Sequence, residues 1–416
     1  MNHKQCVILV GGLGTRLGGL TENCPKPLLD VAGKPFLYYL IWNARRFGFD
    51  DFVLLAGYKN ELVLQFADGI ARTLSCQVRA VVEESPQGTG GALLQAEHLL
   101  DDYFLLMNGD SFFDFNLLDL NLELADSSFL GCIALRQVED AVRFGVVQLV
   151  DGCVKGFSEK PKQSGPELVN GGVYLLSRRI LEHISKEPCS LERDVFPSLA
   201  EKKFLAGKVY EGFFLDIGIP EDFELAQQAI PAAVRHPAVL IDCGAILSQS
   251  SSFTHLIEGF QWAEGGREAI RWLNDKAFFV FVLTSPVDVA QESYFQADVL
   301  KVHRWMTKDL ASIGGHIDGF CYRLNLVNNI SCSNSSIEFD CLKSASYGII
   351  ELFENWPIQA ENSFLLGKKQ SDLDLANRAG VRGILYSGGD VYSVVTDTVL
   401  MTTNFSNFEQ DGLVPY

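Results

Sequence analysis

Residues 7–29 read VILVGGLGTRLGGLTENCPKPLL, and this stretch decides how the rest of the chain is interpreted. Its first four residues are apolar and glycine follows at once, which predicts a short buried strand that ends in a turn. Gly11, Gly12 and Gly14 lie in that turn. Because glycine has no Cβ, backbone N–H groups can converge closely on an anion there. The stretch therefore predicts a strand followed by an anion-binding loop.

Two basic residues follow the glycines and identify the anion. Arg16 and Lys26 can supply the charge-assisted contacts that phosphate groups require. The spacing fits neither G-x-x-x-x-G-K-[ST] nor a clean G-x-G-x-x-G, so a Walker site or an ordinary dinucleotide site is disfavoured. The alternative is a glycine-rich turn that binds nothing. The predicted ligand is phosphate.

Length and composition bound the class of protein. At 416 residues the chain is long for one domain and suggests two or three. A hydrophobic content of 47% and a charged content of 21% are typical of a soluble globular protein. The net charge of −18 argues against a nucleic-acid partner. We therefore expect small anionic substrates, held by a local basic cluster and metal.

Targeting signals and cysteines indicate the compartment. No run of about 18 apolar residues is present, so we expect no membrane span or membrane partner. The apolar run near the start is too short for a signal peptide. The ten cysteines form no C-x-x-C pair and are interpreted as reduced thiols of a cytoplasmic protein. The sequence leaves a homo-oligomer open.

Strand-like and helix-like segments alternate after the glycine-rich loop. A helical apolar pattern is followed by an apolar run, a second helical segment and an alternating strand, at residues 35–47, 51–56, 61–66 and 77–84. This alternation predicts the α/β class, with a parallel sheet covered on both faces. Ligands of such sheets lie at the carboxyl ends of the strands. Asp110 and Asp216 each follow an apolar run and are therefore expected at that edge.

A series of motifs resembles the sugar-1-phosphate nucleotidylyltransferases, which join a nucleoside triphosphate to a sugar phosphate. The motifs, in chain order, are GGLGTRL, PKPL, GTGGA, NGDSFFD, RFGVV, NGGVYLL and DIGIPEDF, within residues 5–228. Among this family, the order of these motifs most resembles the order in D-glycero-α-D-manno-heptose 1-phosphate guanylyltransferases. Mannose 1-phosphate and N-acetylmuramate 1-phosphate (with UTP) stay open as acceptors. The resemblance implies a Rossmann-like mixed sheet of the GT-A-like type.

The resemblance also implies which residues hold the nucleotide. The segment from Glu83 resembles the loop that contacts the base in guanylyltransferases, although Ser85 replaces a usual second Glu. A carboxylate suits guanine because it accepts from both N1–H and the N2 amino group. The alternative is that Glu83 ends a strand in solvent. The implied nucleotide-binding set is Leu9, Gly11, Gly12, Gly14, Thr15, Arg16, Lys26, Glu83, Pro86, Gly88, Thr89, Asn108 and Gly109.

The acceptor half of the site is implied by later motifs. The resemblance assigns Lys160 to the sugar phosphate, and a surface lysine before a turn proline is the alternative. The segment from Ser190 predicts a helix capped by that residue. The charged side chains of this segment could instead be solvated on the helix surface. The implied sugar-phosphate set is Gly145, Glu159, Lys160, Asn170, Gly171 and Glu192.

The implied reaction needs no general base. A sugar phosphate oxygen attacks the α-phosphorus in line and displaces pyrophosphate, and this nucleophile is already an anion. Catalysis then consists of holding two repelling anions together and dispersing the developing charge. The resemblance assigns these tasks to Arg16, Lys26, Asp110 and Asp216, with Mg²⁺ bound by the two aspartates.

A second domain is expected after a Pro/Ala junction. We place domains at residues 1–230 and 238–400, with a linker at 231–237 and a polar tail at 401–416. The second domain resembles haloacid-dehalogenase (HAD)-type phosphatases, specifically heptose 1,7-bisphosphate 7-phosphatases. The resemblance implies a HAD-like α/β fold with phosphatase positions at Asp242, Thr284, Lys343, Lys368 and Asp372.

The departures from that phosphatase pattern point to an inactive domain. Asp242 keeps the nucleophile position, but the general-acid aspartate two residues later is Gly244. Lys368 stands where a metal carboxylate is usual, and its positive charge opposes Mg²⁺ binding. The cysteine spacing does not reproduce a zinc loop. We predict a pseudophosphatase; the alternatives are a bifunctional enzyme and, for the whole chain, a non-catalytic sugar-nucleotide-binding regulator.

Overall fold

The computed structural model describes residues 4–124, 128–158, 165–184, 188–249, 260–284, 296–322 and 352–410. Contacts divide the chain into two compact units, Met1–Val234 and Arg235–Tyr416, which are described separately below as unit 1 and unit 2. Three residues with a predicted site role, Glu159, Lys160 and Lys343, lie outside the described residues.

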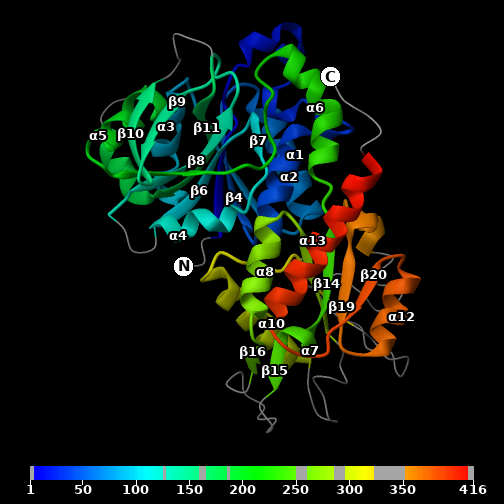
Figure 1. Ribbon diagram of the computed structural model, residues 1–416. Helices are drawn as coiled ribbons and strands as arrows, with labels where there is room; N and C mark the ends of the chain where they lie inside the picture. Colours follow the sequence, from blue (N-terminus) through cyan, green and yellow to red (C-terminus); the bar gives the residue numbers. More distant parts are fainter. Residues whose placement is uncertain are drawn as a thin grey trace. The chain divides into compact units, whose positions relative to one another are not determined.

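Unit 1 is built on a nine-stranded sheet in the order β5-β4-β1-β6-β11-β8-β12-β10-β9 (Figure 1). The first four of these strands are mutually parallel. Strands β4, β1 and β6 are the apolar runs recognised in the sequence, and they are largely buried because both faces of this half are covered, whereas the edge strand β5 is partly exposed. Their bounds are Gln77–Val82 for β5, Asp51–Ala56 for β4, Gln5–Leu9 for β1 and Tyr103–Asn108 for β6.

The other half of the sheet is mixed. Strand β11 (Glu167–Ser177) runs antiparallel to β6, and β8 (Gly131–Val138) pairs antiparallel with β11 and parallel with β12 (Leu205–Val209). Strands β10 (Cys153–Ser158) and β9 (Val146–Val150) complete the edge. The strand–helix alternation alone predicted a parallel sheet, which is wrong for this half, because its strands follow one another with few helices between them. The mixed sheet implied by the family resemblance is the one observed.

Helices cover both faces of the unit 1 sheet. Leu37, Leu40 and Ile41 of α1 pack on one face together with residues of α2, α4 and α6, whereas Leu93 of α3 and Leu199 of α5 pack on the other. The bounds are Phe36–Arg46 for α1, Asn60–Thr73 for α2, Gly88–Gln95 for α3, Leu120–Leu124 for α4, Phe196–Glu201 for α5 and Pro220–Ala233 for α6. The two apolar layers fix the sheet as a rigid platform for its strand ends.

Short elements complete unit 1. A two-stranded antiparallel sheet pairs β7 (Ser111–Phe113) with β13 (Phe214–Asp216), and another pairs β2 (Asp30–Val31) with β3 (Lys34–Pro35). Short helical segments, labelled η, connect the longer elements. They cover Thr15–Thr21 (η1), Lys26–Leu28 (η2), Glu97–Leu99 (η3), Leu117–Asp119 (η4), Arg178–His183 (η5) and Leu191–Val195 (η6).

Unit 2 contains a five-stranded parallel sheet in the order β18-β17-β14-β19-β20. The strands are Gly319–Tyr322, Phe279–Thr284, Ala238–Asp242, Phe364–Gly367 and Arg382–Leu385, in that order. A hairpin of β15 (Leu247–Gln249) and β16 (Phe260–Trp262) lies outside the sheet. The helices are Cys243–Ile246 (α7), Gly266–Asp275 (α8), Gln296–Ala311 (α10), Gln370–Arg378 (α12) and Val391–Gln410 (α13), with a turn at Ala360–Asn362 (η8). Residues of α8, α10 and α13 form one apolar layer with the strands.

The ends of two helices differ from the sequence prediction. Helix α6 continues to Ala233 with Pro231 inside it, so the start of the expected linker is helical. Helix α13 continues to Gln410, so most of the expected tail is helical. Within the described residues, no helix is long and apolar enough to cross a membrane, and eight cysteines are free thiols.

Candidate active site

The glycine-rich loop leaves β1 in a conformation that requires glycine at one position. Gly14 has φ +63°, and a Cβ there would lie 2.8 Å from Cγ2 of Thr21. The Thr21 hydroxyl donates to the carbonyl oxygen of Gly14 at 3.1 Å, which closes the loop on itself. The loop is therefore a preformed turn rather than an open chain segment.

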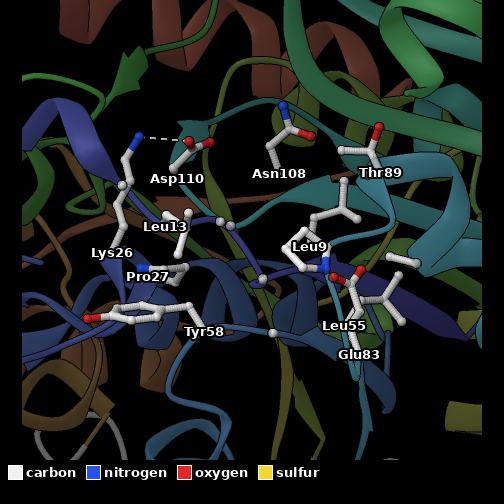
Figure 2. Close-up of a pocket in the computed structure, with 18 of the residues that line it drawn as sticks. Leu9, Leu13, Lys26, Pro27, Leu55, Tyr58, Glu83, Thr89, Asn108 and Asp110 are labelled. Carbon is white, nitrogen blue, oxygen red and sulfur yellow. Dashed lines mark hydrogen bonds and ion pairs between the residues drawn. The ribbon is translucent and has the colours of Figure 1, made fainter. Parts of the chain in front are cut away.

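Lys26 is a buried cation beside the first of the predicted metal carboxylates. Its Nζ lies 2.7 Å from Oδ2 of Asp110, and only 8% of the residue is exposed. Figure 2 shows this ion pair at one end of the cavity that the loop borders. Burial of an ammonium group is costly unless a carboxylate partners it, so the pair holds both side chains in place.

The two predicted metal carboxylates come together although 106 positions separate them in the chain, because β13 pairs with β7 and places Asp216 opposite Ser111. The Ser111 hydroxyl lies 3.2 Å from Oδ1 of Asp110 and 3.1 Å from Oδ2 of Asp216. The backbone N–H of Gly218 donates to Asp216 at 2.7 Å. The arrangement is a carboxylate pair with one shared hydroxyl.

The pair carries unfavourable charge. Burial and the negative charge of Asp110 raise the pKa of Asp216 to about 6, while Lys26 opposes the shift. Two carboxylates that share a site cannot both ionise without cost, and a bound cation would remove that cost. Among the described residues, no group of three or more His, Cys, Asp or Glu gathers as a complete metal cage. Two carboxylates are nevertheless a common protein contribution to Mg²⁺, whose remaining ligands come from phosphates and water.

A cavity of about 720 Å³ opens beside these residues. Its size suits a nucleotide-sized ligand. The walls combine the glycine-rich loop, the end of β4, the segment from Glu83 and the end of β6 (Figure 2). Of the predicted nucleotide-binding set, the lining includes Leu9, Gly11, Gly12, Gly14, Thr15, Lys26, Glu83, Pro86, Gly88, Thr89, Asn108 and Gly109. The cavity also takes in Asp110 and Glu192.

Glu83 lies at the end of the cavity away from Asp110 in Figure 2. Burial raises the pKa of this carboxyl, and a hydrogen bond from the backbone of Gln87 opposes the shift. A Cβ on Gly57 would lie 3.5 Å from Oε2 of Glu83 and 3.0 Å from the carbonyl oxygen of Gly11, so glycine is what lets the three segments converge. Glu83 is half-buried and faces a cavity, not a solvated strand end.

Glu192 joins the cavity through a network of hydroxyls. Its Oε2 accepts from the hydroxyls of Thr89, at 2.9 Å, and Ser190, at 3.0 Å. Ser190 also caps η6, as predicted, by accepting from the backbone N–H of Arg193. The backbone N–H of Leu191 donates to Thr89 at 2.8 Å. The network therefore ties α3 to η6 across the cavity wall.

Several predicted site residues do not line this cavity. Arg16 is exposed on η1, and its assignment to a phosphate stays a prediction. Gly171 has a packing role, since a Cβ there would lie 2.5 Å from the ring of Phe113. Gly145 accepts a hydrogen bond from the backbone N–H of Asn170 at 2.9 Å, so these two members of the predicted acceptor set adjoin one another.

Sequence reasoning missed three residues that organise the cavity. Tyr58 lines it, and its hydroxyl donates to the carbonyl oxygen of Glu22 at 2.8 Å, which links the exit of β4 to the glycine-rich loop. Ser111 bridges the carboxylate pair. Tyr174 is fully buried in β11, and its hydroxyl oxygen accepts from Nδ2 of Asn170. Tyr58 directly follows Gly57 at a strand exit, and Ser111 and Tyr174 lie within quoted motifs, but sequence reasoning gave none of the three a role.

Two aspartates of unit 2, Asp242 at the end of β14 and Asp372 in the first turn of α12, accept hydrogen bonds from nearby backbone N–H groups. Oδ1 of Asp242 accepts from the N–H of Gly244 at 3.0 Å. Asp372 is fully buried, and its Oδ2 accepts from the N–H groups of Lys368 and Lys369, both at 2.9 Å, where it caps α12. Asp372 therefore acts as a helix cap in this structure.

The other two described positions of the expected phosphatase site differ: Thr284 is buried, whereas Lys368 is exposed. The Thr284 hydroxyl lies 3.1 Å from Nε2 of His303, whose ring stacks on Phe320 at 3.8 Å. Burial lowers the pKa of His303 to about 3, so its ring is neutral.

Comparison with known proteins identifies the protein family that unit 1 matches. The sequence profile of the nucleotidyl transferase family matches residues 5–232, which is more than half of the chain. The chain belongs to the nucleotidyl transferase family.

Individual relatives agree with this assignment. The chain is 34% identical over 235 residues to D-glycero-alpha-D-manno-heptose 1-phosphate guanylyltransferase of Aneurinibacillus thermoaerophilus, covering 54% of this chain and 98% of that protein. It is 35% identical over 226 residues to mannose-1-phosphate guanylyltransferase 1 of Arabidopsis thaliana, covering 53% of this chain and 62% of that protein. The crystal structure of HddC from Yersinia pseudotuberculosis is 31% identical with a TM-score of 0.50, covering 55% of this chain and 99% of that chain. The chain thus spans less than two thirds of the plant relative.

Proposed function

We propose that unit 1 transfers GMP from GTP to a sugar 1-phosphate and releases pyrophosphate. The observation that carries the proposal is the carboxylate pair of Asp110 and Asp216 beside Lys26, at one end of a nucleotide-sized cavity. Lys26 offsets only part of the negative charge of the two carboxylates, so the pair can also bind a cation that contacts phosphate. The guanylyltransferase relatives support the same reaction class.

Glu83 supports guanine as the base. It lies at the opposite end of the cavity from the carboxylate pair, so a nucleotide could extend between them (Figure 2). Its carboxylate can accept from two adjacent donors of guanine, whereas adenine offers no such pair. Uracil and thymine offer one N–H, so the discrimination against them is partial. GTP is the proposed donor on this ground.

Asp110 and Asp216 would hold Mg²⁺, which supplies charge neutralisation to the phosphates when bound. Lys26 stays within reach of the same phosphates and is held by its ion pair with Asp110. Backbone N–H groups of the loop from Gly11 would add uncharged donors. The protein thereby gathers positive and dipolar groups around two anionic substrates.

The proposed step is one in-line displacement. An oxygen of the sugar phosphate forms a bond to the α-phosphorus of GTP, and the bond from that phosphorus to the bridging oxygen breaks. The electron pair leaves with pyrophosphate, so atoms and charge balance without an enzyme nucleophile. The attacking oxygen is already an anion, so the protein supplies orientation and electrostatic stabilisation.

D-glycero-D-manno-heptose 1-phosphate is the proposed acceptor, and mannose 1-phosphate is the second candidate. Unit 1 covers 98% of the heptose-specific relative but only 62% of the plant mannose-specific one, which supports the heptose. The two sugars share the manno-configured ring and differ beyond C5. Discrimination therefore requires contacts to the extra hydroxymethylene carbon.

The test is a substrate panel that crosses the four nucleoside triphosphates with the 1-phosphates of heptose, mannose and N-acetylmuramate, followed by pyrophosphate release. We expect turnover with GTP and heptose 1-phosphate. Turnover only with UTP would overturn the role of Glu83, and turnover only with mannose 1-phosphate would overturn the heptose assignment. If no pair reacts, the chain is a binding protein and the proposal fails.

We propose that unit 2 is a HAD-like domain that has lost phosphatase activity. The support is its parallel sheet with Asp242 at the end of the central strand, the replacement by Lys368, and the use of Asp372 as a helix cap. Phosphoryl transfer to an aspartate needs a cation to offset charge repulsion and an acid for the leaving group. Release of phosphate from heptose 1,7-bisphosphate at an enzymatic rate, abolished by Asp242→Asn, would overturn this proposal.

A further inference from the structure

Two hydroxyl groups in the cavity wall donate to the same oxygen of one carboxylate. Oε2 of Glu192 accepts from the hydroxyl of Thr89 at 2.9 Å and from the hydroxyl of Ser190 at 3.0 Å. A carboxylate oxygen has about two lone-pair sites, so these two bonds occupy Oε2 fully. Oε1 of Glu192 has no hydrogen bond within the described part of the chain and is not buried, and Glu192 lines the cavity. One oxygen of the carboxylate is therefore held by the protein, and the other is open to a ligand.

Backbone donors fix the direction of both hydroxyl protons. The N–H of Leu191 donates to Oγ1 of Thr89 at 2.8 Å, and the N–H of Arg193 donates to Oγ of Ser190 at 3.2 Å. A backbone N–H can only donate, so each hydroxyl oxygen accepts in that bond and keeps its single proton for Glu192. An ionised carboxylate can only accept, which agrees with this direction. The Thr89 hydroxyl consequently has no proton left for a ligand phosphate.

The two segments that carry this network are also joined through their backbones. The N–H of Gly90 donates to the carbonyl oxygen of Cys189 at 2.8 Å, and the N–H of Cys189 donates to the carbonyl oxygen of Gln87 at 2.8 Å. A Cβ on Gly88, which has φ +75°, would clash with the same carbonyl oxygen of Cys189. Glycine thus permits the close approach of α3 to the chain that enters η6. The hydroxyl network is built on a backbone frame and not on a free loop.

We propose that Thr89 is a positioning residue that, together with Ser190, fixes Glu192 so that its Oε1 accepts from a ligand hydroxyl. The inference rests on the proposed function, which brings two polyhydroxylated ligands to this cavity, the ribose of the nucleotide and the sugar phosphate. Both sources share the same donor chemistry. The family resemblance implies a nucleotide contact for Thr89, which lies in the cavity wall in Figure 2, whereas its hydroxyl proton serves Glu192. Thr89 therefore acts through Glu192.

The experiment compares Thr89→Val, Thr89→Ser and Glu192→Leu in the full-length chain. Thr89→Val keeps the size of the side chain and removes the hydroxyl. We expect it to raise the KM of the sugar phosphate, or the Kd of GTP, by roughly three- to tenfold with kcat little changed. Thr89→Ser restores the hydroxyl and should recover most of that loss. Thr73→Val is the matched control, because Thr73 ends α2 and its hydroxyl donates to the carbonyl oxygen of Gly69 at 3.1 Å.

The double variant Thr89→Val/Glu192→Leu tests whether the two residues act together. It should bind no worse than Glu192→Leu, because the hydroxyl of Thr89 has no effect once the carboxylate is gone. Ser190→Ala removes the other hydroxyl and should shift the same constant in the same direction, which keeps the test decisive if Thr89→Val does not fold.

Two further arms identify the ligand hydroxyl. If the ribose supplies it, 2′-deoxy- or 3′-deoxy-GTP binds wild-type protein roughly three- to tenfold more weakly than GTP, and Glu192→Leu abolishes that preference. If the sugar supplies it, the Kd of GTP is unchanged and the KM of the sugar phosphate rises in both Thr89→Val and Glu192→Leu. Either result supports the proposal.

Other outcomes overturn it. If Thr89→Val and Ser190→Ala bind both substrates as Thr73→Val does, or if Thr89→Ser is as impaired as Thr89→Val, the hydroxyls do not position Glu192. Additive losses in the double variant would show that Thr89 acts independently of Glu192. Wild-type protein that neither binds GTP nor turns over any substrate pair would instead refute the proposed function, and this inference would fall with it.

Discussion

Both units place aspartates at or near the carboxyl ends of strands, but they use them in opposite ways. In unit 1, Asp110 and Asp216 share one hydroxyl and repel each other, and the pKa of Asp216 is raised to about 6. In unit 2, Asp372 accepts two backbone N–H groups and Asp242 accepts one. In the first arrangement the single ammonium of Lys26 faces two carboxylates, so a net negative charge stays beside the cavity. In the second, carboxylate oxygens accept hydrogen bonds from nearby backbone N–H groups.

The difference shows that a strand-end position does not by itself define a reactive site. Electrostatic strain at a concave surface is the better indicator, because a ligand or cation can relieve it. Lysines show the same contrast: Lys26 is buried against a carboxylate, and Lys368 is exposed. Matching substitutions of aspartates and lysines in the two units therefore test this contrast.

The largest expected effect comes from neutralising the aspartates. Asp110→Asn and Asp216→Asn should each lower kcat/KM for pyrophosphate release by about 10³-fold, because each removes one of the two carboxylates that would hold Mg²⁺. Asp242→Asn should change it by less than about twofold. Steady-state kinetics with GTP and the accepted sugar phosphate measure both. If the unit 1 and unit 2 variants lost kcat/KM equally, the two units would not differ in how they use their aspartates.

The lysine pair gives the next largest difference. Lys26→Met should lower kcat/KM by about 10²-fold, since it removes a buried positive charge and leaves Asp110 without its ion-pair partner. Lys368→Met is the control and should stay within about twofold of wild type, because its side chain is exposed. Activity of Lys26→Met close to wild type would exclude Lys26 from the proposed phosphate site.

Stability should respond with opposite signs in the two units. Asp216→Asn should raise the local free energy of unfolding by about 1–2 kcal/mol, because it removes a carboxylate whose pKa is raised in the folded state. The gain is smaller than the full pKa shift would give, because the side chain is partly exposed to solvent. Asp372→Ala should lower it by about 1–3 kcal/mol, because two N–H groups lose their acceptor. Native-state hydrogen exchange of β13 and α12 reports each unit separately. If both substitutions changed the local free energy of unfolding in the same direction, the contrast between the units would be wrong.

The smallest effect is the pH dependence that Asp216 gives to unit 1. An unfolded aspartate titrates near pH 3.9, so between about pH 4 and 6 folded Asp216 binds more protons than the unfolded chain. Ionisation therefore lowers the stability of unit 1 as pH rises through that window, and the penalty is complete above it. Hydrogen exchange of β13 at pH 4.5 and 7 should show a larger loss in wild type than in Asp216→Asn. An identical loss in both would assign the pH dependence to other groups.

Local patterns predicted much of the fold. The apolar runs at β1, β4 and β14 were placed to within about two residues, because a buried strand bounded by glycine or a carboxylate has a short-range signature. Ser190 was identified as a helix cap for the same reason. The antiparallel half of the unit 1 sheet was not predicted from alternation, since pairing between distant strands has no local signature.

The functional site was likewise predicted from the sequence only in part. The residues that line the cavity were mostly identified, since the motifs after successive parallel strands meet at one edge of the sheet. Ser111, Tyr174 and the ion pair of Lys26 with Asp110 were not, because each depends on partners far away in the sequence.

The sequence by itself determined which segments are strands, where glycine permits a close turn, and which charges stand at strand ends. Those properties depend on side-chain size, polarity and backbone freedom over a few residues. Only the tertiary structure decided that Asp110 and Asp216, 106 positions apart, come within reach of the same Ser111 hydroxyl. Charge repulsion, burial and hydrogen bonding depend on distances of a few ångströms, and in a folded chain those distances are set by strand pairing and packing across more than a hundred residues.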